Sequence, residues 1–295
     1  MKEINYEVVL DLFRIIVLVV INVIGIRIIS MKSKTQTEKS KTISEMQPLL
    51  FSGMDDYDDN DGGGKRTICL VFFILAMLCM LFNDVYWLVY DILRPDIRMP
   101  FAANEFAEWA FFMMLGAALS YHNPIRFRYA VTETICAILF TSANVALWIG
   151  WSGEWLQDIL TGPVFAYFIC SVVWKVKKEE AFSNKQFGLL GITAFMIISA
   201  EAVTFFVGEA PTVFIENVCF GVLLAVTVIL FARTIISFYK GEAAGKCVAC
   251  AFTFFAWNVF FMYLSEEIHW LIASGFSGIS FIAMFVGIVK EAGKK

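Results

Sequence analysis

The sequence predicts an all-α fold, a polytopic transmembrane helix bundle of about nine spans. The 295 residues are 59% hydrophobic and only 17% charged, whereas soluble domains have about 45–50% apolar and about 25% charged residues. The apolar residues form runs of about 18 or more, and ~20 helical residues cross the ~30 Å hydrocarbon layer of a bilayer. Lys and Arg are also distributed among the connections as one orientation requires. We therefore expect lipid to cover most of the surface.

Apolar runs of spanning length recur from the first residues to the last. The first is predicted to be a span and not a signal peptide, because its leading segment MKEINYE is not basic and no small-residue cleavage site follows. The predicted spans are 7–29, 67–92, 104–121, 130–150, 156–175, 187–207, 212–238, 247–264 and 268–289.

A polar segment, 31–66, separates the first span from the others. It contains KSKTQTEKSKT, which is polar, and DDYDDNDGGGK, which is acidic and then Gly-rich. Such composition is typical of a disordered linker. We expect an N-terminal transmembrane helix over 1–30, a cytoplasmic linker over 31–66, and an eight-helix core over 67–295 that folds without the first helix.

The predicted core contains a weak internal similarity. Pro100 precedes Asn104 at the start of the third span, and Pro211 precedes Asn217 at the start of the seventh, about 110 residues later. Four spans in each half make this a parallel 4+4 pseudo-repeat. Chance similarity is the alternative, since Asn and acidic residues are favoured at any helix start.

The cations of the connections predict the orientation. With 31–66 in the cytoplasm, alternate connections place their Lys and Arg inside, and the outer connections hold only Lys2, Arg94 and Arg98. The sequence thus predicts a multi-pass protein of the cytoplasmic membrane, with its N-terminus outside and its C-terminus inside.

Carboxylates and tryptophans collect at the predicted outer ends of the spans. Asp84 and Trp87 are spaced i, i+3 and share one helical face, and Glu105 and Glu108 occupy the first turns of the next span. Ionisable residues within spans are costly and usually face a cavity, a pathway or a partner. Arg14 is the candidate to pair with them. We predict that one ligand-binding site contains Asp84, Trp87, Glu105, Glu108, Trp109, Glu201 and Glu216.

Each of these residues also has a simpler explanation. A glutamate at a helix start can cap the helix, an aspartate can hydrogen-bond a neighbouring span, and tryptophans form belts at membrane interfaces. The prediction of a site therefore depends on the group and not on any single member.

Enzymatic signatures are absent from the sequence. His122 and His269 fall on opposite sides of the predicted membrane, so they cannot share a metal. Lys is absent from the interior of every span, so a Schiff base has no anchor. There is no nucleophile elbow, phosphate loop or kinase signature. We predict no catalytic residue, no metal and no cofactor. Cys247 and Cys250 are interpreted as small apolar fillers.

The expected partners follow from this chemistry. Carboxylates beside aromatic rings suit an amine through ion pairing and cation–π contact. We expect the lipid bilayer and a small cationic or amphiphilic ligand as partners, a cytoplasmic signalling partner in addition, and no nucleic acid. The aromatic-rich spans with polar groups gathered outside resemble, in architecture, the seven- or eight-span sensor regions of bacterial signalling proteins. The leading hypothesis is ligand sensing or an accessory role. A secondary transporter of a cationic or amphiphilic solute and a carboxylate-based intramembrane lipid hydrolase are the alternatives.

Overall fold

The computed structural model describes residues 6–46, 61–93, 103–120, 131–152, 155–178, 218, 221–222 and 267–293, and all of these are helical. The predicted sixth, seventh and eighth spans lie outside the described residues, apart from residues 218 and 221–222. The helices are α1 (Tyr6–Met46), α2 (Asp61–Leu93), α3 (Ala103–Ser120), α4 (Val131–Ser152), α5 (Trp155–Lys178) and α9 (Glu267–Gly293).

Four of the described helices are long and apolar enough to cross a membrane: Val8–Thr35, Thr67–Tyr90, Trp155–Trp174 and Leu271–Lys290. The described chain is thus all-helical and has the character of a helical membrane protein, as the sequence predicts. Helix α3 is not among the four, because its 18 residues include Asn104, Glu105 and Glu108. The number of nine spans and the 4+4 pseudo-repeat stay predictions.

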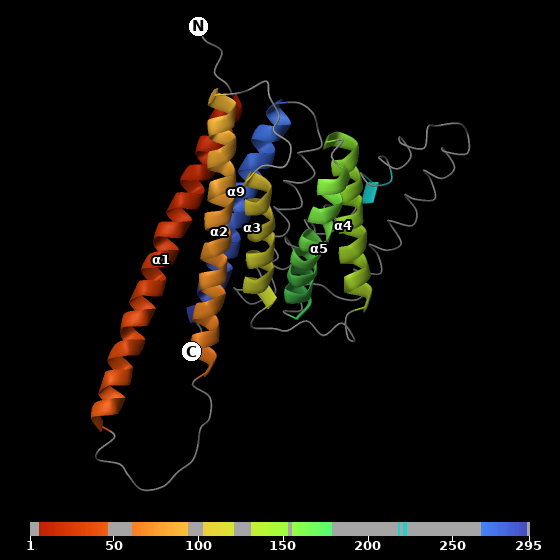
Figure 1. Ribbon diagram of the computed structural model, residues 1–295. Coiled ribbons are helices and arrows are strands. Elements are labelled where there is room, and N and C mark those ends of the chain that lie inside the picture. The colour runs from red at the N-terminus through yellow and green to blue at the C-terminus, as the bar shows by residue number, and fades with distance from the viewer. Residues whose placement is uncertain are drawn as a thin grey trace, which may run out of the picture.

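The described helices pack side by side in a row, and α9 packs against the part of it that α1 and α2 form (Figure 1). Helix α1 lies along α2, α2 packs on α3, α3 packs on α5, and α5 packs on α4, while α9 contacts both α1 and α2. Helices α1 and α2 run in opposite directions, so the first turns of α1 lie beside the last turns of α2 (Figure 1). Residues from the start of the chain thereby reach residues that follow them by about seventy positions.

One face of α1 is buried and the rest is exposed. Leu10, Leu18 and Ile21 are at most 7% exposed, whereas Ile16 and Val23 are more than half exposed. The buried positions recur at helical spacing, which is typical of a helix that packs by a single stripe. Gly25 permits the closest approach, since a Cβ atom there would collide with the side chain of Ile74 on α2.

Aromatic side chains fill the core between α3, α4 and α5. The rings of Phe112 and Phe165 meet edge to face with centroids 5.1 Å apart, and Trp148 meets Phe165 at the same centroid distance. Phe165 is 1% exposed. Edge-to-face pairs of this kind add to the energy of burial. The core therefore holds α3 and α5 in fixed register next to the polar residues at their starts.

Helices extend into part of the predicted linker 31–66. Helix α1 continues to Met46 and α2 begins at Asp61, while residues 47–60 lie outside the described part of the chain. Residues 31–46 contain no Gly or Pro and many good helix formers such as Lys, Glu, Gln and Met. Their lack of an apolar face made them look disordered in the sequence. The division into a separable first helix and an eight-helix core stays a prediction.

Candidate functional site

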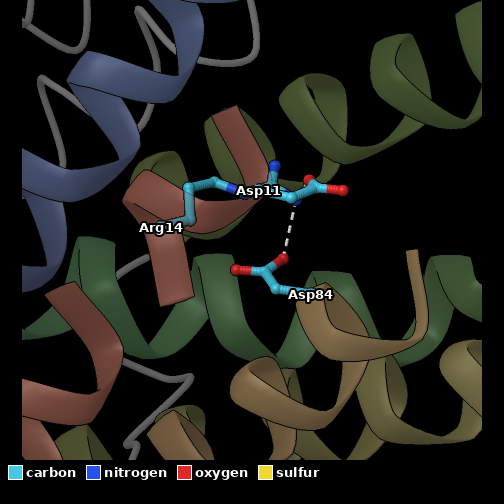
Figure 2. A network of polar contacts seen from close by, with 3 residues as sticks. All are labelled: Asp11, Arg14 and Asp84. Atoms are coloured by element: carbon cyan, nitrogen blue, oxygen red, sulfur yellow. Dashed lines mark hydrogen bonds and ion pairs between the residues drawn. The ribbon is translucent and has the colours of Figure 1, made fainter. Parts of the chain in front are cut away.

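Arg14 of α1 forms a partly buried ion pair with Asp84 of α2 (Figure 2). Its Nη2 donates a hydrogen bond of 2.7 Å to Asp84 Oδ1 and one of 3.2 Å to Asp11 Oδ1. Asp11 and Arg14 are three residues apart and share a helical face. Asp84 is completely buried, with 0% of its surface exposed. The ion pair therefore ties the start of α1 to the last third of α2.

Helices α3 and α5 add three more carboxylates to this region. Glu105 and Asp158 are buried, with 8% and 9% exposed, and each lies in the first turn of its helix. Glu108 lies within electrostatic range of both, and also of Asp84 and Arg14. We call Asp11, Asp84, Glu105, Glu108 and Asp158 the acidic cluster. Among the described residues, Arg14 is the cation that faces it.

Buried amide oxygens lie next to the acidic cluster in the chain. Asn83 and Asn104 are each 6% exposed, and they directly precede Asp84 and Glu105. Within the described residues, Oδ1 of each accepts no hydrogen bond, and neither does Oδ2 of Asp84. A buried acceptor without a donor costs about 1–3 kcal/mol. This end of the bundle therefore holds three buried acceptor oxygens for which the described residues supply no donor.

Trp109 joins α3 to α5 beside the acidic cluster. Its Nε1 donates a hydrogen bond of 2.7 Å to Thr161 Oγ1, and Thr161 in turn donates to the carbonyl oxygen of Gln157 at 3.0 Å. Thr161 lies three residues after Asp158, on the same face of α5. The indole N–H of Trp109 therefore has a structural partner, and its ring is fixed near the acids of both helices.

Trp87 belongs to an aromatic group on α2. Its ring meets Tyr90 at a centroid distance of 5.6 Å and Tyr86 at 5.9 Å, nearly perpendicular in both cases. It lies one turn beyond Asp84 on α2. The three rings therefore lie between Asp84 and the C-terminal end of α2.

The structure thus brings three of the predicted carboxylates, Asp84, Glu105 and Glu108, into one region. Asp84 pairs with Arg14, and Glu108 lies within electrostatic range of Glu105, Asp84 and Arg14. Glu201 and Glu216 lie outside the described residues. Two members of the acidic cluster, Asp11 and Asp158, were not among the predicted site residues. Asp11 lies three residues before Arg14, and Asp158 lies three residues before Thr161. This spacing places each pair on one helical face, and it was the signal in the sequence that could have identified the two aspartates. Binding of a ligand by these residues stays a prediction.

Neither the arrangement of possible metal ligands nor a comparison with known proteins assigns a function to this region. Within the described ranges, no three His, Cys, Asp or Glu side chains lie close enough together to hold a metal ion. No protein-family model, curated protein or solved structure matches this chain.

Proposed function

We propose that the chain is a multi-pass protein of the cytoplasmic membrane with an outward-facing site for a small cationic ligand, and that it acts in sensing or in an accessory role. One observation carries the proposal: within the described part of the chain, four helices contribute five neighbouring carboxylates, and Arg14 is the cation among them. Such an excess of acid in a site shielded from water attracts a second cation.

The ligand chemistry follows from the neighbours of the acidic cluster. Trp87 and Trp109 offer aromatic faces, which attract organic cations through cation–π contact. The acceptors on Asn83 and Asn104 suit a ligand with N–H groups. We favour a protonated amine or a guanidinium over a bare metal ion. Glu201 and Glu216 join the proposed site on the basis of the sequence alone.

The orientation and the nine spans belong to the same proposal. Lys and Arg of the sequence support an N-terminus outside and a C-terminus inside. The acidic cluster lies at the end of the described helices where the N-terminus lies (Figure 1). With that orientation the site faces outward, where a sensor or accessory protein would meet its ligand.

A thermal-unfolding screen on the purified full-length protein tests the binding. We expect methylammonium or methylguanidinium to raise the unfolding midpoint in a saturable manner, and methylurea, the neutral relative of methylguanidinium, to have no effect. Glu108→Gln should weaken the response about tenfold, a loss of about 1.4 kcal/mol. Glu45→Gln is the matched control, because position 45 lies about 46 Å along α1 from Arg14 at ~1.5 Å per residue. If no cation stabilises the protein beyond an equal ionic strength of NaCl, the proposal is wrong.

A further inference from the structure

We propose that Arg14 is a built-in competitor of the ligand, so that an external cation replaces its guanidinium on Asp84 and thereby releases α1 from α2. The inference rests on the proposed function, because it requires that the acidic cluster binds an external cation. It adds the residue that regulates binding and the movement that binding produces.

The exposure of the two partners shows which one an incoming cation meets. The Asp84 side chain is completely buried, whereas 20% of the Arg14 side chain is exposed. Arg14 is therefore the accessible member of the pair, and its guanidinium covers the carboxylate. In the proposed exchange, the incoming cation takes the place of Arg14 on Asp84 Oδ1.

The hydrogen bonds between the partners leave room for exchange. The pair uses one donor atom and one acceptor atom, Nη2 and Oδ1. Within the described residues, Asp84 Oδ2 accepts no hydrogen bond and Arg14 Nε finds no acceptor, although both atoms are buried. A carboxylate binds a guanidinium more strongly through two parallel hydrogen bonds than through a single one. A ligand that satisfies both oxygens of Asp84 can therefore compete with the resident arginine.

The remaining contacts of α1 suggest that exchange would loosen the helix. Leu18 and Ile21 are buried against apolar residues, but lipid tails solvate such side chains almost as well as another helix does. The amide of Asn22 donates to the carbonyl oxygen of Leu18 in its own helix, at 2.8 Å. The ion pair of Arg14 with Asp84 is thus a polar contact that docked α1 makes and a helix in lipid lacks.

Helix α1 can carry such a movement across the membrane. It is one continuous helix from Tyr6 to Met46. The part beyond Arg14 is about 48 Å long at ~1.5 Å per residue, which exceeds the ~30 Å hydrocarbon thickness. A displacement at the Arg14 end therefore reaches the opposite side of the bilayer, where a cytoplasmic partner can detect it.

Neutralisation of Arg14 tests the competition. The full-length protein and its variants are titrated with methylguanidinium, and the apparent Kd is taken from the unfolding midpoint. We expect at least tenfold tighter binding by Arg14→Gln, equivalent to about 1.4 kcal/mol. We expect no change for Arg27→Gln, since Arg27 is exposed on the same helix. If Arg14→Gln does not fold, the apparent Kd of Arg14→Lys is measured instead. We expect tighter binding by this variant too, because a compact ammonium competes less well for the carboxylate than a planar guanidinium.

The outcomes separate this inference from the proposed function. Equal or weaker binding by Arg14→Gln, with clear binding by the wild type, would overturn the competition and leave the proposed function intact. Binding by Arg14→Gln alone would support the competition and count against the proposed function of the wild type. Absence of binding in both proteins would overturn both proposals.

The release of α1 is measured by pulsed electron paramagnetic resonance. Spin labels are placed at Met31→Cys on α1 and Ile68→Cys on α2, two exposed positions, in a protein whose seven native cysteines are replaced by Ala. We expect methylguanidinium to shift or broaden this distance distribution. The pair Ile68→Cys and Met113→Cys, on α2 and α3, should not respond. An unchanged distribution between α1 and α2 at saturating methylguanidinium would overturn the release.

Discussion

Among the described residues, Arg14 is the cation that pairs with the fully buried carboxylate of Asp84. Removal of one member of a buried ion pair typically costs about 3–5 kcal/mol, because the other charge stays behind. We expect Arg14→Gln to lower the unfolding midpoint strongly in the absence of ligand. In Arg14→Gln/Asp84→Asn most of the loss should be recovered, since no charge is left unpaired. Additive losses in this double-mutant cycle would show that the two side chains do not interact in the folded protein.

The hydrogen bond between Trp109 and Thr161 gives a second prediction for single residues. Thr161→Val keeps the shape of the side chain but removes the acceptor of the indole N–H. We expect a loss of about 1 kcal/mol in the free energy of unfolding, the usual value for a neutral hydrogen bond. In a Trp109→Phe background the same substitution should have little effect. A loss of equal size in both backgrounds would mean that Thr161 acts only within α5, through Gln157.

The candidate site shows what helical spacing can reveal and what it cannot. Asp84, Glu105 and Glu108 stand out in the sequence because charged residues are rare within apolar runs. Asp158 lies at the start of the predicted span 156–175, directly after GEWLQ, and the sequence alone did not assign it to the site. Its proximity to Glu108 depends on the packing of α3 on α5, a contact between residues fifty positions apart that no local pattern encodes.

At the scale of helices, close packing depends on glycines at particular contacts. A Cβ atom at position 116 of α3 would lie 2.5 Å from the ring of Tyr167 on α5. The ring cannot move freely, because its hydroxyl is hydrogen-bonded to Ser120 at 2.9 Å. We expect Gly116→Ala to lower the free energy of unfolding by about 1–3 kcal/mol, as overpacking usually does.

Gly275→Ala is the control for that substitution. A Cβ atom at position 275 of α9 meets nothing within 4 Å, so the change should be neutral or stabilising by up to about 1 kcal/mol, through helix propensity. Both free energies can be measured by unfolding in mixed micelles with increasing sodium dodecyl sulfate. Equal effects of the two substitutions would argue against the close contact of α3 with α5.

Deletion of the first helix gives the other prediction at this scale. The sequence suggests that residues 67–295 fold alone, but Arg14 supplies a cation to buried Asp84. We therefore expect a protein without residues 1–60 to unfold at a lower temperature than the full chain. Asp84→Asn should restore part of the loss in the truncated protein and should not stabilise the full-length protein. A truncated protein that is monodisperse and as stable as the full chain would show that α1 is separable.

At the scale of the whole molecule, the composition and the lengths of the apolar runs predicted the helical membrane fold. They predicted the candidate functional site less well. The long apolar runs correspond to α1, α2, α5 and α9 because the requirement for ~20 apolar residues is set by the bilayer and is independent of packing. The end of the first helix could not be found in this way. Residues 31–46 are helical without being apolar, and hydropathy gives no signal for such a segment.

The orientation of the whole bundle gives the last prediction, because every functional inference above requires the acidic cluster to face outward. Single cysteines at Ile97→Cys, Phe182→Cys and Glu242→Cys, in a background without native cysteines, are treated with a membrane-impermeant maleimide on intact cells. We expect rapid labelling at position 97, which belongs to a predicted outer connection, and labelling at 182 and 242 only after permeabilisation. Labelling of position 97 only after permeabilisation would reverse the bundle. The acidic cluster would then face the cytoplasm, and its ligand would have to be sought among intracellular cations.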